Sequence, residues 1–444
     1  MRLFEWHSES FSEYKDKLPD FVNYLSGVWQ NRNRYVELID DVTEEEKHEQ
    51  NIQRQRFFDF TIDGKISARN YVGVVQFEGI RIDVFPKIFA GETIHDIKKW
   101  QVNLLYWLTY CRKIKFPFSL ASISKLDFDS FLELLIYVFA NYTEEILSQQ
   151  PFQAYQKVEE ETTFLKGRLS FENYTKNNLI TGKWQNFYCI HEPFVYDNLF
   201  NRIIKYVTHR LSSISDNFLN KEKLNEILFL LHDVSDEMIS AADCDKVQLN
   251  PLYEDHKQIL ELCKMFLSNQ VIDMESNDSK NFCFMVPMEY IFEDFIFGFI
   301  SDKWPELHIR NQSTDYLALN EGAEVFQIRN DIYIDDQLII DTKYKIRSND
   351  DGLKAGVSQS DLYQMVSYAI RRNCENVLLL YPYIESAQNA PTLFKVPSEM
   401  LSEELNIQVE SIDITFDDIQ MADDLIMERV KGINSFLISL SLIL

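Results

Sequence analysis

The stretch RNDIYIDDQLIIDTKYK, from Arg329 to Lys345, decides the fold of the C-terminal part of this 444-residue chain. Two apolar runs flank the polar residues Asp335 to Gln337, which is typical of a β-hairpin. A three-residue loop at this point pairs Ile334 with Leu338. A two-residue loop would spoil this register unless a bulge repaired it.

Charged residues occupy every second position of the second predicted strand. The two-residue period places Asp341, Lys343 and Lys345 on one face, and the three-residue loop places Asp331 opposite Asp341 on the same face. Two carboxylates beside a lysine can hold a hard cation and orient water for phosphodiester hydrolysis. The same charges also suit an edge strand that resists aggregation, and the pattern alone leaves both interpretations open.

The sequence around this stretch predicts an α/β domain with a central mixed sheet. Apolar residues at helical spacing predict helices over 288–304 and 360–372. Strands are expected over 326–344 and in the apolar run VLLLYPY at 377–383. Helices and strands in this order favour a layered α/β arrangement.

Upstream of this domain the pattern changes twice. Alternating apolar residues between Gly-containing turns predict a meander of strands over 57–88, and the sequence around Lys166 and Gly167 predicts a pair of strands. Helical spacing recurs between about 96 and 270. We therefore predict an α+β multidomain chain with an N-terminal β-rich, partner-docking domain over 1–95, a mainly helical middle region over 96–272 with a hairpin near 158–171, and the C-terminal domain over 282–444.

The composition excludes several classes of protein. The chain has 70 acidic and 44 basic residues and a formal charge of −26, which disfavours sequence-independent coating of nucleic acid. The longest apolar run, Leu134 to Ala140, is too short to cross a membrane, and no signal peptide is seen. The six cysteines form no CxxC pair. These features predict a cytoplasmic protein without membrane contact.

Several common catalytic motifs are missing from the sequence. It contains no GxxxxGK[ST], GxGxxG, GxSxG or HExxH pattern. We therefore expect that this chain binds no nucleotide, and that any nucleotide-driven step belongs to a partner.

The residues Asp331, Asp341 and Lys343 resemble the signature of PD-(D/E)xK nucleases. The sequence around them resembles the McrC family, the nuclease subunit of McrBC-type modification-dependent restriction systems. One departure is Asn330, which stands where the usual proline precedes the first aspartate. The resemblance rests on a series of landmarks in the same order: GVVQFEGIRIDVFPKI, LKGRLSF, FVYDNLFNRIIKYV, YIFEDFI, IIDTKYK, SDLYQMVSYA and LLLYPY.

This resemblance implies a role for each matching residue. Asp331 and Asp341 would bind metal, and Lys343 would be the catalytic lysine. Glu293 matches an acidic residue that often supplies a third metal-binding carboxylate, with two alternatives, Glu289 and Asp294.

The helix over 360–372 carries a further match. Gln364 and Tyr368 resemble a QxxxY motif, and their four-residue spacing allows both to point into one cleft. Alternatively, the helix merely packs its apolar residues Leu362, Val366 and Ala369 against the sheet.

The family resemblance implies a function in a modification-dependent restriction system of the 5-methylcytosine type, and hence in antiviral defence. The chain would be a Mg²⁺-dependent endonuclease, with Mn²⁺ able to substitute, that cuts double-stranded DNA when coupled to an McrB-like AAA+ GTPase ring. It would also stimulate that GTPase, and dimerisation of complexes on DNA would supply two nuclease centres. The alternatives are a non-cleaving adaptor or activator of the AAA+ partner and a stand-alone DNA nuclease.

Contact with the partner is expected from the N-terminal and middle regions. The polar segment Thr43 to Arg56 is a candidate for a projection that enters the ring, with Arg54 and Arg56 as contacts. An exposed loop without a partner is the alternative.

Overall fold

The computed structural model describes eleven parts of the chain, and these form two compact units. The parts are 1–36, 55–90, 97–111, 128, 130–155, 157–268, 281–334, 337–349, 352–397, 404–418 and 421–430. The first unit combines 1–134 with 269–444, and the second comprises 135–268. No helix within these parts is long and apolar enough to cross a membrane.

A four-stranded sheet joins the two chain segments of the first unit. Its order is β1 (Arg2–Phe4), β6 (Ile80–Phe85), β5 (Tyr71–Phe77) and β12 (Phe282–Pro287). Gly73 in β5 has φ +137°, and a Cβ there would lie 2.0 Å from the Phe284 carbonyl oxygen of β12. Only glycine permits this approach. The compact units therefore differ from the predicted ranges 1–95, 96–272 and 282–444, because β12 completes a sheet of N-terminal strands.

The predicted meander over 57–88 forms four strands, but they belong to two sheets. β3 (Phe58–Phe60) and β4 (Lys65–Ala68) pair in a separate sheet with β2 (Ser8–Ser10), in the order β2-β4-β3. β5 and β6 are buried along most of their length, whereas β4 alternates between buried and more exposed residues. β1 and β12 pair with the outer edges of β6 and β5, so both strands lie in the interior of the sheet. Helix α1 (Leu18–Val36) contributes Phe21 and Leu25 to the same core.

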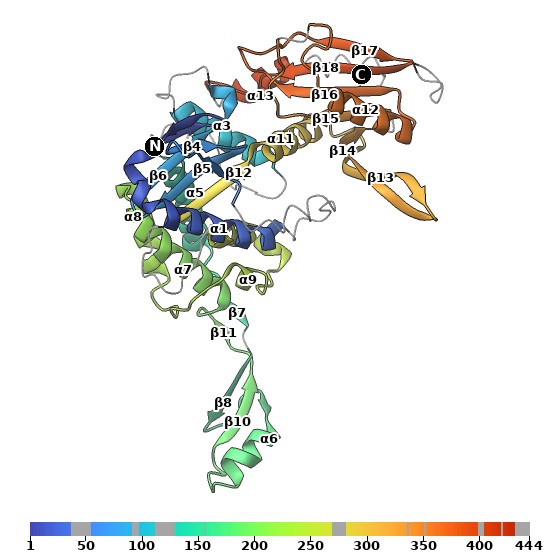
Figure 1. Ribbon diagram of the computed structural model, residues 1–444. Helices are drawn as coiled ribbons and strands as arrows, with labels where there is room; N and C mark the ends of the chain where they lie inside the picture. The colour runs from blue at the N-terminus through green and yellow to red at the C-terminus, as the bar shows by residue number, and fades with distance from the viewer. Residues whose placement is uncertain are drawn as a thin grey trace. The chain divides into compact units, whose positions relative to one another are not determined.

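A six-stranded mixed sheet dominates the C-terminal part of the first unit (Figure 1). β13, β14 and β15 are antiparallel, β15, β16 and β18 are parallel, and β17 pairs antiparallel with β18. The predicted α+β class with a mixed sheet is therefore confirmed. The strands are, in spatial order, β13 (Ile309–Asn320), β14 (Ala323–Ile334), β15 (Leu338–Thr342), β16 (Asn376–Pro382), β18 (Leu405–Ile412) and β17 (Thr392–Val396).

Three helices of the first unit position the sheet. α12 (Gln359–Arg372) connects the parallel strands β15 and β16 and packs Met365 and Ala369 into the core of the sheet. α11 (Met288–Lys303) contacts β14 and α3 (Ile97–Tyr110). The predicted helices in these regions are confirmed. The remaining short elements are η1 (Ser12–Lys17), η2 (Lys87–Phe89) and α13 (Ala422–Arg429).

The second unit contains the predicted middle helices and a small β module. The helical part contains α5 (Phe131–Gln149, from 135 onward), α7 (Leu199–Ile214), α8 (Phe218–Leu230), α9 (Ala241–Cys244), η4 (Pro251–Tyr253) and α10 (Glu254–Ser268). The short pair β7 (Ala154–Tyr155) and β11 (Phe194–Val195) leads to the module (Figure 1). The module contains β8 (Val158–Thr162), β9 (Arg168–Leu169), α6 (Phe171–Asn173), η3 (Tyr174–Leu179) and β10 (Phe187–His191).

The predicted hairpin near 158–171 is wrong in its pairing. β8 and β9 are both strands, but they do not pair with each other, because β10 lies between them. Gly167 has φ +70°, and a Cβ there would lie 2.5 Å from the Ile190 carbonyl oxygen. The turn therefore presses against β10 rather than folding β9 back onto β8.

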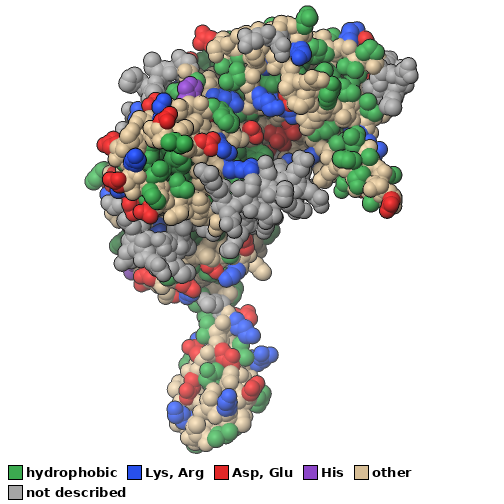
Figure 2. Space-filling model, viewed as in Figure 1, with side chains coloured by type: hydrophobic (Ala, Val, Ile, Leu, Met, Phe, Trp, Pro, Cys, Tyr) green, Lys and Arg blue, Asp and Glu red, His purple; other side chains and the backbone are tan. Residues whose placement is uncertain are grey.

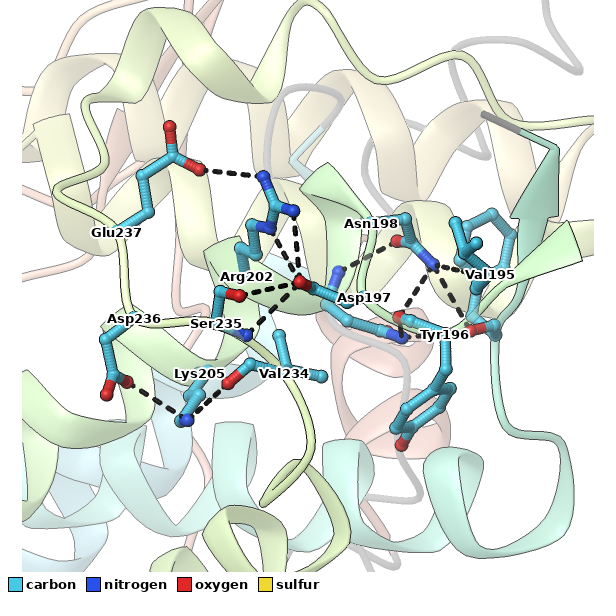
Figure 3. A network of polar contacts seen from close by, with 12 residues as sticks. Val195, Tyr196, Asp197, Asn198, Arg202, Lys205, Val234, Ser235, Asp236 and Glu237 are labelled. Atoms are coloured by element: carbon cyan, nitrogen blue, oxygen red, sulfur yellow. Dashed lines mark hydrogen bonds and ion pairs between the residues drawn. The ribbon is translucent and has the colours of Figure 1, made fainter. Parts of the chain in front are cut away.

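A polar network fixes the start of α7 (Figure 3). Asn198 caps the helix, since its side chain accepts a hydrogen bond from the Asn201 N–H, and its Nδ2 donates to the carbonyls of Val195 and Tyr196. Next to this cap, Arg202 Nε donates to Asp197 Oδ1 at 2.7 Å. This hydrogen bond lowers the pKa of Asp197 to about 2.

We expect Asn198→Ala to lower the free energy of unfolding by about 2 kcal/mol, because it removes a helix cap and the hydrogen bonds that Asn198 Nδ2 donates to the carbonyls of Val195 and Tyr196. Urea denaturation followed by circular dichroism measures this loss. The matched control is Asn217→Ala, which removes only the cap of α8 and should cost about 1 kcal/mol. Equal losses in the two variants would contradict the role given to Asn198 Nδ2.

Candidate functional site

The register of β14 and β15 places the predicted residues together. Ile334 pairs with Leu338 and Ile332 pairs with Ile340, as the three-residue loop predicts. The face of the sheet that carries Tyr333 and Ile339 packs against α12. By the two-residue period, Asp331 and Asp341 lie on this same face.

Asp331 is held by the residue that follows Asp341. Both the backbone N–H and the hydroxyl of Thr342 donate to Asp331 Oδ2, at 2.7 and 2.8 Å. The predicted alternation placed Thr342 on the opposite face. The difference arises because the pairing of the two strands ends at Ile332 and Ile340, which frees the Thr342 N–H for a side-chain acceptor. Burial raises the pKa of Asp331, and the nearby Lys343 opposes this shift.

Asp341 and Lys343 form a buried ion pair. Asp341 is 1 % exposed, and its Oδ2 lies 2.6 Å from Lys343 Nζ. Its Oδ1 is buried and has no hydrogen-bond donor among the described residues. Burial, and then the charge of Asp331, raises the pKa of Asp341 to about 7. Burial alone would lower the pKa of Lys343, but Asp341 and Asp331 together raise it above its ordinary value.

Glu293 of α11, the predicted third carboxylate, lies near enough to Asp331 for their charges to interact. Gln312 Nε2 donates to Glu293 Oε1 at 3.0 Å. Burial, and then the charge of Asp331, raises the pKa of Glu293 to about 8. Of the two alternatives, Glu289 instead acts electrostatically on Glu5, whereas Asp294 acts weakly on Glu293 itself.

The predicted pair on α12 lies beside these carboxylates. Gln364 Nε2 donates to Tyr368 Oη at 2.5 Å. Burial, and then the charge of Asp341, raises the pKa of Tyr368. The ring of Tyr368 also belongs to the core beneath α12, against which Leu362 and Val366 pack. The packing of this helix against the sheet is therefore confirmed, whereas the role of Gln364 and Tyr368 in the site stays a prediction.

Four polar residues near the site were not predicted from the sequence. Gln312 and Thr342 bind the carboxylates directly, and Arg329 lowers the pKa of both Glu293 and Asp331. Asp361 Oδ1 lies 2.8 Å from Lys345 Nζ. The two-residue period could have identified Arg329, which shares a face with Asp331. Gln312 carries no such signal, because its position depends on a left-handed φ of +47° in β13.

The donor set of the site suits a hard cation. Carboxylate oxygens are the ligands that Mg²⁺ prefers, and Asp341 Oδ1 is a buried acceptor without a donor. Among the described residues, no three His, Cys, Asp or Glu side chains converge closely enough to enclose an ion as they stand. The positive charge beside Asp341 comes instead from Lys343. Figure 2 shows acidic and basic side chains gathered in a hollow on the face that is drawn.

The predicted ring-entering segment Thr43 to Arg56 lies almost wholly outside the described residues. Only Gln55 and Arg56 belong to the parts that the structure describes. Its role therefore stays a prediction.

Comparison with known proteins identifies one family. The family model for the McrBC 5-methylcytosine restriction system component matches residues 66–382. A refined half-complex from a tetradecameric assembly of Thermococcus gammatolerans McrB AAA+ hexamers with bound McrC matches with a TM-score of 0.71 and 17% identity, over 98% of this chain and 99% of that chain. The cryo-EM structure of the Thermococcus gammatolerans McrBC complex matches with a TM-score of 0.49 and 18% identity, over 67% of this chain and 85% of that chain. No curated protein matches.

We expect the free energy of unfolding, in buffer without divalent metal, to fall as the pH rises from about 5 to about 8. The folded chain keeps a proton on Glu293 up to a pKa of about 8, whereas the unfolded chain loses it near the ordinary value of 4.5. The stabilisation is therefore complete at low pH and is lost as the pH rises. Glu293→Gln should flatten this dependence in thermal unfolding experiments with a chelator present.

The control for this experiment is Asp302→Asn, which removes an exposed charge from the same helix. It should leave the pH dependence as in the wild type. An equally steep fall in Glu293→Gln would show that this carboxyl is not the source.

Proposed function

Since this chain belongs to the family of McrBC 5-methylcytosine restriction system components, as its McrC component, we propose that it is the Mg²⁺-dependent endonuclease subunit, which cuts DNA when coupled to an AAA+ GTPase partner. The observation that supports this proposal most directly is the group of Asp331, Asp341 and Lys343 at the ends of two paired strands, in which Asp341 is buried and the other two residues are half-buried. An edge strand decorated with charge against aggregation would expose these side chains rather than bury them. Buried groups that shift each other's pKa values favour a catalytic role.

Asp331, Asp341 and Glu293 are the residues that would hold Mg²⁺ or Mn²⁺. A bound ion would polarise a phosphate oxygen and lower the pKa of a bound water. The chain's own part is to keep these three carboxylates in place. Thr342 fixes Asp331 through two hydrogen bonds, and Gln312 fixes Glu293 through one.

Lys343 would act as a donor rather than as a base. Its neighbours raise its pKa, so its Nζ stays protonated at neutral pH. A protonated Nζ can hold an attacking water by hydrogen bonding and offset the negative charge that develops on the phosphate. Tyr368 lies close enough to the carboxylates to take part in this network, with Gln364 orienting its hydroxyl.

The alternative functions predict different behaviour. An adaptor that does not cleave would stimulate the partner and have no use for a buried carboxylate group. A stand-alone nuclease would cut linear DNA by itself and need no second unit. The charge of −26 favours a subunit that a partner delivers to DNA, because the chain's own field repels a polyanion.

The module of β8, β9 and β10 is our candidate for contact with the AAA+ partner. Its aromatic and aliphatic side chains point outward: Phe164, Leu165, Phe171, Ile180 and Trp184 are all at least 60 % exposed. Exposed apolar side chains gathered in this way are typical of interaction surfaces. The relative from Thermococcus gammatolerans is McrC bound to AAA+ hexamers, and we extend that partnership to this chain as part of the proposal.

We expect Asp341→Ala and Lys343→Ala to slow cleavage of 5-methylcytosine-containing plasmid at least a hundredfold, which corresponds to about 3 kcal/mol of transition-state stabilisation. The assay contains the AAA+ partner, GTP and Mg²⁺. Stimulation of the partner's GTPase should persist, since neither residue lies in the second unit. Lys395→Ala, at an exposed ion pair of β17, should cut normally.

Undiminished cutting in both site variants would overturn the assignment of the site and favour the adaptor function. Cutting of linear DNA by the chain alone would favour the stand-alone nuclease.

We expect Trp184→Ser and Phe171→Ser to reduce stimulation of the partner's GTPase about tenfold, because each removes an exposed apolar contact. The matched control is Phe218→Ser, which removes an equally exposed aromatic ring from α8 of the same unit. Steady-state GTP hydrolysis at several chain concentrations measures the effect. Equal stimulation by all three variants would exclude the module as the docking surface.

A further inference from the structure

A buried polar cluster joins the N-terminal sheet to the residue after Lys343. Glu5 follows β1 and is fully buried, and Lys87 follows β6 and is 7 % exposed. Tyr344, which comes directly after Lys343, is also buried. We call Glu5, Lys87 and Tyr344 the junction.

Each member of the junction contacts both others. The Lys87 backbone N–H and the Tyr344 hydroxyl donate to Glu5 Oε2, at 2.9 and 2.8 Å. Lys87 Nζ donates to the Tyr344 carbonyl oxygen at 2.7 Å and lies 4.0 Å from the centre of the Tyr344 ring. Two side chains from the N-terminal sheet therefore hold both the backbone and the ring of Tyr344.

Two backbone hydrogen bonds shape the chain directly after β15. The Lys343 N–H donates to the Leu380 carbonyl at 2.8 Å, and the Lys345 N–H donates back to the Lys343 carbonyl at 2.7 Å. The chain thus turns tightly after its last hydrogen bond to β16. The direction in which Lys343 points is set by this turn, and the junction fixes the residue at its centre.

The junction also reaches the helix that carries the third carboxylate. The charge of Glu289, one turn before Glu293 in α11, acts on both Glu5 and Lys87. The rings of Phe292 and Tyr344 lie 5.9 Å apart. Movement of the junction would therefore displace both α11, which carries Glu293, and the segment after β15, which carries Lys343.

Burying ionisable groups such as Glu5 and Lys87 is costly, so the junction is not explained by stability alone. Replacing buried charges by apolar residues is often neutral or stabilising, whereas their hydrogen bonds fix a single geometry. Glu5 Oε1 even remains without a hydrogen-bond donor among the described residues. We therefore infer that the junction serves to orient Tyr344 rather than to stabilise the fold.

We propose that Glu5 and Lys87 are positioning residues of the cleavage site, which hold Tyr344 and thereby aim Lys343 at the carboxylates. The inference rests on the proposed function. It means that two residues that follow strands of the N-terminal sheet support the cleavage site through Tyr344.

The test is the double variant Glu5→Gln and Lys87→Met in the full chain with its AAA+ partner. The glutamine keeps an acceptor for the Tyr344 hydroxyl, and the methionine leaves no lone buried charge, so the fold should persist. The matched control is Lys303→Met with Asp423→Asn, which removes an ion pair elsewhere in the same unit. Two readouts are compared, amide hydrogen exchange over residues 338–348 and cleavage of 5-methylcytosine-containing plasmid.

We expect the junction variant to exchange faster over residues 338–348 and to cut about tenfold more slowly, with an unchanged KM for DNA and unchanged GTPase stimulation. The control should change neither readout. Unchanged exchange in the junction variant, or an equal loss of cutting in the control, would overturn the inference. If the wild type does not cut, the proposed function fails, while the exchange result still decides whether these residues hold the segment.

Discussion

The cost of keeping three carboxylates away from bulk water governs the C-terminal part of this molecule. Asp331 repels both Asp341 and Glu293, and the burial of Asp341 and partial burial of the other two reduce screening by water. Each ionised group costs several kcal/mol in such surroundings unless a partner compensates. The neighbouring polar groups offset this cost. The Lys343 ammonium pairs with Asp341, Thr342 donates two hydrogen bonds to Asp331, and the Gln312 amide donates one to Glu293.

The sequence predicts the centre of this arrangement but not its supports. Asp331 and Asp341 could be brought together because strand periodicity and loop length fix a register, and that register is present. The contacts of Thr342 and Gln312 could not be predicted in this way. The contact of Thr342 depends on where the pairing of two strands ends, and that of Gln312 depends on its own left-handed backbone conformation. The residues that carry charge are visible in a pattern, whereas those that orient them depend on local backbone geometry.

The same distinction holds for the fold. Helices such as α11 and α12 were predictable because their apolar spacing is regular. β18 was not, because its alternating apolar residues Leu405, Ile407 and Val409 lie within an acidic run. Asn330 replaces an expected proline inside β14, where it pairs with Ser313 in a long antiparallel ladder that a proline would interrupt. The departure from the motif therefore suits the length of this strand.

The pairing of β5 with β12 bears on the order in which the chain can be built. Gln76 and its partner Phe282 are separated by more than two hundred residues, so β5 has an open edge until the ribosome has released β12. An unpaired edge strand is a template for association with other chains. The nascent N-terminal half thus exposes this edge during synthesis, and its last strand arrives only as the segment bearing the candidate site begins to emerge.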